Sequence, residues 1–315
     1  MFAPVQVDPS VEDVLREELA QGDAAIGTIA PILRYLLAND DHSLFNDQIV
    51  ARVRGMIDHV AVQLLDAIED AEGAGPARDH CAERIEHVVS ALVERSALLA
   101  HGHALALEFQ LSERLQARIA LDPVLSPLLQ ALIASPDSAT AASAMALLAA
   151  QARFAQTQRR MQLPLEDLPA DLFHAALQVL RTIPADPAVL ARAEATLRAG
   201  YDEGRNRLGL MSRLVIGMGG GATAALAVGH AGVGLFLTAL SLGAGQDRDL
   251  TALAAHEGQL ARLALALRAA GMRPETIEEQ FMAIHPDVSL PAGFEGLGAD
   301  RAAALLSHSF KGAGR

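Results

Sequence analysis

The chain of 315 residues carries a net charge of −13, and 51% of its residues are hydrophobic. This acidic balance disfavours binding to the phosphate backbone of nucleic acids, and the single cysteine, Cys81, excludes an internal disulfide and a multi-thiolate metal site. Alanine and leucine dominate over β-branched residues and no tryptophan is present, which favours helices over strands.

The negative charge is concentrated in the first half of the chain. Through residue 155 there are 22 acidic and 10 basic residues, a balance of −12, whereas the remainder has 16 acidic and 15 basic residues, a balance of −1. An acidic half of this kind keeps a protein soluble or attracts a basic partner. The first residues contain neither a basic segment nor an apolar core, so we expect no secretory signal and a cytoplasmic location.

The first predicted helices follow from apolar periodicity and from stop signals. Ser10 begins a capping pattern, Gly22 is expected to end the first helix, and Pro31 to kink or break the second. His101 and Gly102 are expected to close the fourth. The expected ranges are about 10–22, 23–39, 43–72, 78–100 and 107–119, which together suit a helical bundle.

Prolines punctuate the middle of the chain. Ser135 and Pro136 form a start signal for a helix that is expected to reach residue 162. The following residues 163–169, LPLEDLP, are expected to form a loop. We therefore predict two domains, an acidic helical bundle at 1–162 and a second helical domain at 163–315.

The second half is expected to be helical at about 170–182, 187–200, 203–229, 233–244, 247–270, 274–284 and 299–309. The spacing of Leu, Ala and Arg in residues 190–200 recurs in residues 260–271. A solenoid-like repeat of helix pairs therefore stays open as an interpretation.

Residues 214–245 form an uncharged stretch of 32 residues that permits three interpretations. A membrane span is disfavoured, because nine of these residues are Gly and only twelve are Leu, Ile, Val, Met or Phe. A dinucleotide-binding loop at Gly217-x-Gly219-x-x-Ala222 is disfavoured, because the acidic residue expected about 20 positions further on is missing. The third interpretation is a buried helical hairpin that turns near residues 232–234.

The hairpin interpretation depends on a stripe of small residues. Gly217, Gly221, Ala225 and Gly229 recur every four residues, which places them on one face of a helix. Such a face permits the close approach of another helix, either within the chain or from a second copy. We therefore take these four residues as candidates for an interface or for a pocket wall.

Three arginines and one histidine adjoin or lie within this stretch. Arg205, Arg207 and Arg213 precede it, and arginine binds phosphates and carboxylates through paired hydrogen bonds. An anion or acidic-partner site is one interpretation, and ion pairs with neighbouring acidic residues are the other. His230 lies inside the apolar run, where a buried ring would need a hydrogen-bond partner.

The clearest candidates for a metal site are histidines and glutamates of the first half. His80, Glu83 and His87 share a helical face, and His101 and His103 follow. The Glu-x-x-His pattern of di-iron proteins is absent, so we expect a solvated polar face and no metal. Neither a P-loop nor a His-Glu-x-x-His pattern is present, and we expect no cofactor and name no catalytic residue.

Residues 159–174 and 246–271 resemble Ala- and Arg-rich bacterial helical proteins of unknown function, and this resemblance implies no activity. We expect an all-α protein, a multi-helix bundle with a C-terminal helical layer around the 214–245 hairpin. The leading hypothesis is a non-enzymatic interaction or regulatory protein that binds a protein partner or itself, as a homodimer. The alternative is a helical module for an apolar or lipid-like ligand, bordered by Arg205, Arg207 and His230.

Overall fold

The computed structural model describes residues 10–38, 47–73 and 80–309. Within these ranges the chain is all-α and contains no strand, which confirms the predicted multi-helix fold class. None of the helices in the described ranges has the length and apolar character that a membrane crossing needs.

Six α-helices, within the described residues, precede the predicted domain boundary. They are α1 (Val11–Ala38), α2 (Asp47–Glu72), α3 (Ala82–Val93), α4 (Ser96–Ile119), α5 (Pro127–Ile133) and α6 (Ser138–Arg159). Helix α6 begins later than the start signal at Ser135 and Pro136 predicts, because its N-cap is Asp137, whose side chain accepts a hydrogen bond from the Thr140 amide.

The second half alternates short α-helices with 3-10 turns. In order these are η1 (Leu165–Asp167), α7 (Ala170–Leu180), α8 (Pro187–Gly200), η2 (Glu203–Arg205), α9 (Arg207–Gly217), η3 (Gly219–Leu226), α10 (Val228–Ala231), α11 (Val233–Ala244), α12 (Arg248–Ala254), η4 (Glu257–Gln259), α13 (Leu260–Ala269), α14 (Pro274–Ile284), η5 (Phe294–Gly296) and α15 (Ala299–Ser309).

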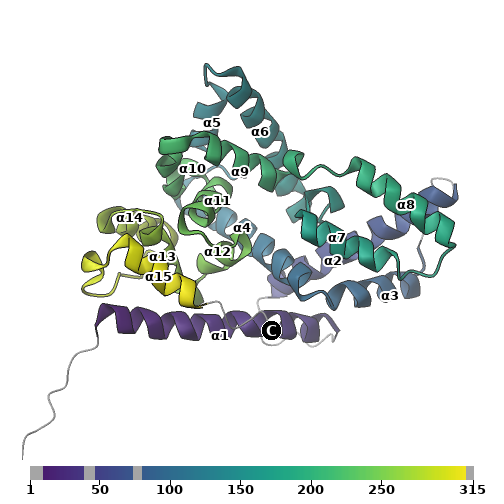
Figure 1. Ribbon diagram of the computed structural model, residues 1–315, viewed down its shortest axis with the longest axis horizontal. Helices are drawn as coiled ribbons and strands as arrows, with labels where there is room; N and C mark the ends of the chain where they lie inside the picture. Colours follow the sequence, from purple (N-terminus) through teal and green to yellow (C-terminus); the bar gives the residue numbers. More distant parts are fainter. Residues whose placement is uncertain (1–9, 39–46, 74–79, 310–315) are drawn as a thin grey trace, which may run out of the picture.

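Two clusters of buried apolar side chains form the core. The α2 cluster joins α2, α3, α7 and α8, and the α11 cluster joins α5, α6 and the helices from α9 to α15. The long helices α1 and α4 contribute side chains to both clusters, and Figure 1 shows α1 running alongside both groups of helices. The buried side chains between residues 163 and 193 belong to the α2 cluster, and the domain boundary at 162/163 stays a prediction.

Helix α1 continues through both positions where the sequence predicts a break. At Gly22 the backbone carbonyl accepts a hydrogen bond from Gln259 Nε2 at 2.8 Å, and the Gln259 side chain occupies the space where a Cβ would lie. Pro31 is exposed, and the adjacent Leu33 is completely buried. The expected helix end at Gly22 is therefore wrong, and α1 is not broken at Pro31, because packing along α1 offsets the hydrogen bond that proline removes.

The predicted helix end at His101 and Gly102 is also wrong. The break occurs earlier, between α3 and α4, and α4 continues through a run of nine buried residues, 101–109. A Cβ on Gly102 would lie 3.7 Å from side-chain atoms of Met56 and Val53. These are ordinary van der Waals distances, so Gly102 lies inside a continuous helix packed against α2 and does not terminate it.

The uncharged stretch does not form the predicted continuous helix from 203 to 229. Helix α9 ends at Gly217, η3 follows, and the backbone of Gly219 has a φ of +53°. Three consecutive glycines at 219–221 oppose helix formation, which explains the break. The chain turns again at Gly232, where φ is +75°. The expected helix from 247 to 270 is likewise interrupted, by η4 between α12 and α13.

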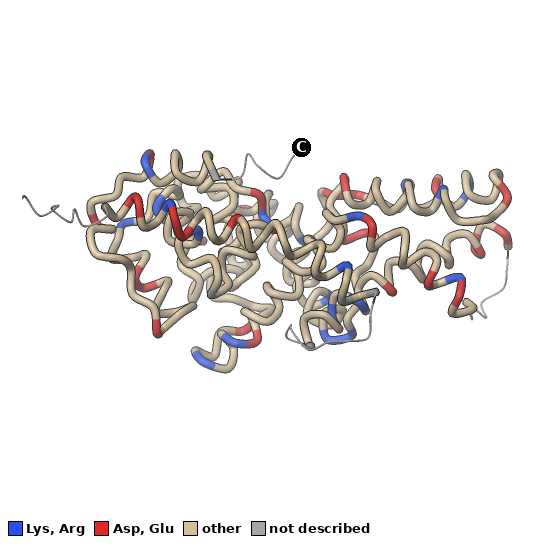
Figure 2. The backbone as a smooth tube through the Cα atoms, turned by 90° about the horizontal axis from the view of Figure 1, so that it is seen from below, with Lys and Arg blue, Asp and Glu red and all other residues tan. Residues whose placement is uncertain are grey.

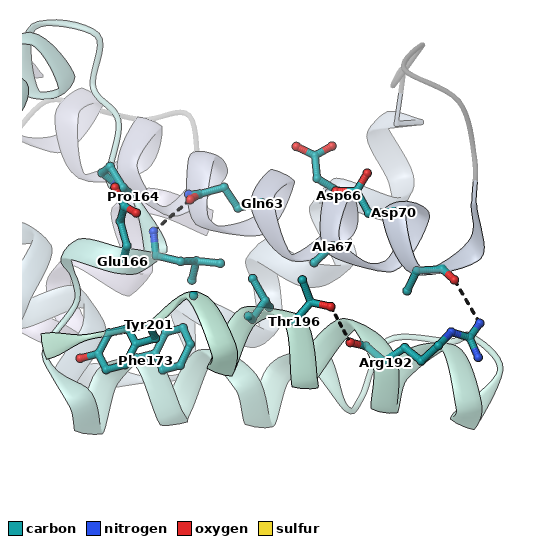
Figure 3. A pocket seen from close by; sticks show the side chains of 14 residues that line it. Gln63, Asp66, Ala67, Asp70, Pro164, Glu166, Phe173, Arg192, Thr196 and Tyr201 are labelled. Atoms are coloured by element: carbon teal, nitrogen blue, oxygen red, sulfur yellow. Dashed lines mark hydrogen bonds between the residues drawn. The ribbon is translucent and has the colours of Figure 1, made fainter.

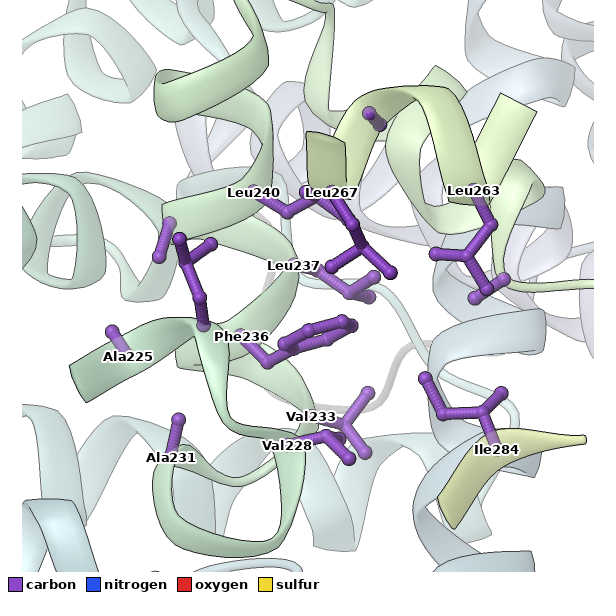
Figure 4. Close-up of a cluster of buried hydrophobic side chains, with 14 of the residues drawn as sticks. Ala225, Val228, Ala231, Val233, Phe236, Leu237, Leu240, Leu263, Leu267 and Ile284 are labelled. Atoms are coloured by element: carbon purple, nitrogen blue, oxygen red, sulfur yellow. The ribbon is translucent and has the colours of Figure 1, made fainter. Parts of the chain in front are cut away.

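Helix α11 is the centre of the α11 cluster. Its residues 233–241 are all buried, and Phe236 and Leu240 are completely inaccessible. Figure 4 shows the Phe236 ring surrounded by aliphatic side chains of α10, α11, α13 and α14. Residues 233–241 of the 214–245 stretch therefore belong to the buried core.

Candidate functional site

A buried carboxylate lies where three helices meet. Glu108 of α4 is 2% exposed, and it accepts hydrogen bonds from Arg207 of α9 and Arg248 of α12. The Arg207 contact is bidentate, with Nη1 to Oε1 at 2.7 Å and Nη2 to Oε2 at 3.0 Å. Arg248 Nη2 reaches Oε2 at 2.8 Å. One carboxylate thus ties α9 and α12 to α4.

The electrostatics of Glu108 are dominated by its partners. Burial raises the pKa of Glu108, but the guanidinium groups of Arg207 and Arg248 outweigh it and bring the pKa to about 2. Arg207 also donates to Gln151 Oε1 at 2.9 Å and stacks on the Phe154 ring, 3.6 Å from its centroid. The carboxylate is ionised at neutral pH and is enclosed on all sides, so this cluster holds helices together and offers no room for a substrate.

A second buried pair lies beside the first. His101 of α4 is fully buried, and its Nδ1 lies 2.8 Å from Asp249 Oδ2 of α12. Burial raises the pKa of Asp249, whereas His101 and Arg248 lower it, and the net pKa is below the ordinary value. The His101–Asp249 pair therefore adds a second link between α4 and α12.

His103 of α4 gives the protein a predicted pH dependence. Burial, reinforced by the charge of His256, lowers the pKa of His103 from 6.5 to about 4. The unfolded chain therefore binds more protons than the folded one between these values, and stability is lost as the pH falls from about 6.5 towards about 4.

We expect His103→Leu to reduce the change in the free energy of unfolding between about pH 6.5 and about pH 4. Chemical denaturation of wild type and variant at a series of pH values measures it, with His308→Leu, on an exposed face of α15, as the control. Parallel profiles for wild type and His103→Leu would contradict the assignment.

A groove lies between α2 and α8, with a cavity volume of about 690 Å³. Ala67 and Leu197 give it an apolar lining, and η1 and α7 contribute to one end (Figure 3). At that end Gln63 Oε1 accepts a hydrogen bond from the Leu165 amide at 2.9 Å, which fixes η1 against α2. At the other end Arg192 Nη2 donates to the Ala71 carbonyl at 3.0 Å. Both ends of the groove are thus held by hydrogen bonds.

The groove is acidic. Asp66, Asp70 and Glu166 line it, and Arg192 is the basic residue among its lining side chains. The second half of α2, residues 60–72, contains four acidic residues and no lysine or arginine. Figure 2 shows acidic positions recurring at the end of the molecule that α2, α3 and α8 build. The groove therefore presents negative potential around an apolar floor, which favours a ligand with positive charge.

The four small residues of the predicted stripe do not share one helical face. Gly217 ends α9, Gly221 and Ala225 lie in η3, and Gly229 lies in α10. Ala225 is buried, whereas the three glycines are exposed. A Cβ on Gly217 or Gly229 would meet no atom within 4 Å, so these glycines are not needed for close packing inside the chain.

The predicted arginine and histidine candidates are dispersed. Arg207 is buried with Glu108, Arg213 donates to the Gly204 carbonyl, and Arg205 is exposed. His230 lies exposed on α10. Arg213 and Gly217 line one cavity, of about 330 Å³, while Arg205, Arg207 and His230 line none of the cavities named in this section.

His80 precedes the start of α3, so His80, Glu83 and His87 do not share one helical face as the sequence predicts, and Glu83 and His87 are exposed. His80 Nε2 lies 3.0 Å from Asp66 Oδ1, and its Nδ1 lies 3.0 Å from Glu69 Oε1. Among the described residues, no three His, Cys, Asp or Glu side chains form a group that could hold a metal ion.

The groove residues Glu166 and Tyr201 were not candidates from the sequence alone. Both lie in segments that read as loops, LPLEDLP and the residues after Gly200. The acidic excess noted in the sequence covers the chain through residue 155 and therefore includes α2 but neither of these two residues.

Comparisons with family models, with curated proteins and with solved structures find no significant match to this chain.

Proposed function

We propose that the protein is a non-enzymatic interaction protein that binds a basic, partly apolar segment of a partner protein in the groove between α2 and α8. The observation that carries this proposal is the combination of a cavity of about 690 Å³, an apolar floor and three lining carboxylates. Basic side chains of a partner would pair with Asp66, Asp70 and Glu166, while its apolar side chains would contact the floor. A cytoplasmic location fits this role and is part of the proposal.

The test compares a basic probe peptide with a neutral one. The probe is a fluorescent ten-residue peptide with four arginines and three leucines, and the neutral peptide has glutamine in place of every arginine. The groove variant is the triple substitution Asp66→Asn, Asp70→Asn and Glu166→Gln. Each exposed ion pair contributes about 0.2–1 kcal/mol, so three together predict a loss of affinity of about 3- to 100-fold at low salt.

A matched control carries the same change of net charge elsewhere. Glu83→Gln, Glu86→Gln and Glu113→Gln remove three exposed carboxylates that do not line the groove. Fluorescence anisotropy should show saturable binding of the basic peptide to wild type and to this control, and weaker binding to the groove variant. Equal loss in both triple variants would show that net charge, rather than the groove, attracts the peptide.

Self-association is a second proposal, favoured by the exposed apolar surface at the start of the glycine-rich segment. Ile216 is 67% exposed, and Gly217, Gly220 and Gly221 beside it are exposed as well. A second copy of the chain packing there would cover this surface. Light scattering coupled to size exclusion tests it with wild type and Gly221→Leu, and a wild-type monomer at high concentration would eliminate it.

The proposal of an apolar or lipid-like ligand is favoured by another cleft, of about 470 Å³. Ile26, Leu172, Leu208 and Leu253 give it apolar walls, and Arg248 lies at its edge. Native mass spectrometry of the purified protein tests this proposal. A spectrum with the mass of the bare chain alone would count against it.

A further inference from the structure

The protein contains an internal example of arginine recognition. The Arg207 guanidinium lies 3.6 Å from the centroid of the Phe154 ring, and its two terminal nitrogens bond both oxygens of Glu108. An aromatic face and a carboxylate thus bind a guanidinium from two directions, by stacking and by paired hydrogen bonds.

One end of the groove presents the same two components without a guanidinium. Tyr201 stacks on Phe173 with ring centroids 4.0 Å apart and an angle of 5° between the ring planes. Both rings line the groove at the end where Glu166 of η1 lies, as Figure 3 shows. Phe173 is buried and Tyr201 is half-buried, so Tyr201 is the ring more open to a ligand. Glu166 is exposed and makes no hydrogen bond or ion pair within the described residues.

The surroundings of Tyr201 are negative. Its hydroxyl donates to the Leu168 carbonyl at 2.8 Å, which fixes the ring. Burial, with added effects of the Glu203, Asp171 and Asp202 carboxylates, raises the pKa of Tyr201 to about 12. Arg192 lies at the opposite end of the groove, where it is bonded to the Ala71 carbonyl. A cation is therefore attracted to the Tyr201 end without competition from a basic side chain of the groove.

We infer that this end of the groove is a subsite for one arginine side chain of the partner segment, with its guanidinium stacked on Tyr201 and hydrogen-bonded to Glu166. The inference rests on the proposed function, because it names the group that the groove selects. Arginine fits better than lysine, since a planar guanidinium stacks on a ring and offers two parallel donors to a carboxylate.

The experiment is a citrulline scan of the four-arginine peptide, in which each arginine in turn becomes citrulline, a neutral side chain of the same shape. One position should lose about 5- to 20-fold in affinity for wild type, which is the expected combined effect of an exposed cation–π contact and an exposed ion pair. The same replacement should cost less in Glu166→Gln, about 2- to 5-fold, because the ion pair is already broken and only the cation–π contact is lost. Lysine at that position should bind more weakly than arginine.

Three further variants distinguish the Tyr201 end of the groove from its other parts. Asp70→Asn should weaken binding yet preserve the effect of citrulline at the selected position, since Asp70 lies on α2 away from the Tyr201 end (Figure 3). Tyr201→Phe should preserve binding, whereas Tyr201→Leu should weaken it, and circular dichroism checks that both variants fold. An equal effect of citrulline in wild type and Glu166→Gln would overturn the subsite, even with tight binding. Absence of saturable binding by any peptide would instead overturn the proposed function.

Discussion

Replacing Glu108 by alanine is expected to lower the free energy of unfolding by about 3–5 kcal/mol, because it leaves the buried Arg207 guanidinium and the half-buried Arg248 guanidinium without their carboxylate. Arg207 is 4% exposed and, among the described residues, would keep Gln151 as its side-chain hydrogen-bond acceptor. Arg248 would keep its hydrogen bond to the Thr238 hydroxyl, at 3.2 Å from Nε. Urea or thermal denaturation measures the effect.

The control is Glu113→Ala, an exposed position on the same helix. Both substitutions have the same effect on helix propensity, and the control is expected to change stability by no more than about 0.5 kcal/mol. A Glu108→Ala variant as stable as the control would show that Glu108 does not hold α9 and α12.

The ionisation of Glu108 also sets how the free energy of unfolding changes at acid pH. The pKa of Glu108 is about 2 in the fold, against an ordinary value of 4.5. The stabilisation by its ionised form is therefore complete above about pH 4.5 and is lost as the pH falls through about 2. In Glu108→Gln this loss should disappear, and the stability of that variant should be low already at neutral pH.

Replacing Phe236 by alanine is expected to cost about 3–5 kcal/mol, because the side chain is completely buried in α11 and its removal leaves a cavity. Val233, Leu263 and Ile284 lie around the ring and come from three different helices (Figure 4), so the cavity cannot be closed by the movement of one helix. Denaturation of wild type and variant, with far-ultraviolet circular dichroism to check the helical content, measures this effect.

Leu242→Ala is the matched control. Leu242 lies on the same helix as Phe236 but is 45% exposed, so its truncation should cost far less. Equal losses for the two variants would contradict the position of α11 at the centre of the core.

The sequence was sufficient for the fold class and for the location of α11. Period-3.6 apolar patterns identify α2 and most of α4, and the lack of charge in residues 233–245 identifies a buried helix. The positions at which helices end were harder to predict. Gly22 and Gly102 read as helix ends, yet both lie inside helices that pack against the rest of the fold, and at Gly22 the Gln259 side chain occupies the space of a Cβ. A single sequence does not show such tertiary contacts.

The candidate site depends even more on contacts between distant residues. Arg207 and Glu108 are 99 positions apart, so the sequence gives no reason to pair them, and Arg207 was grouped instead with its neighbours Arg205 and Arg213. Glu166 and Tyr201 meet α2 only because α7 and α8 fold back on it. Composition could indicate an acidic surface, but the shape of the groove follows from the packing of α2 against α8.

Photochemical cross-linking of the four-arginine peptide to the full chain locates the peptide-binding surface. One leucine of the peptide carries a photoreactive benzophenone, and mass spectrometry locates the modified residues of the protein. Cross-links are expected at residues 63–71 and 192–201, on the two walls of the groove, and an excess of the unlabelled peptide should suppress them. Suppressible cross-links concentrated at residues 216–224, or at the cleft lined by Ile26, Leu172 and Leu253, would contradict the groove as the binding site.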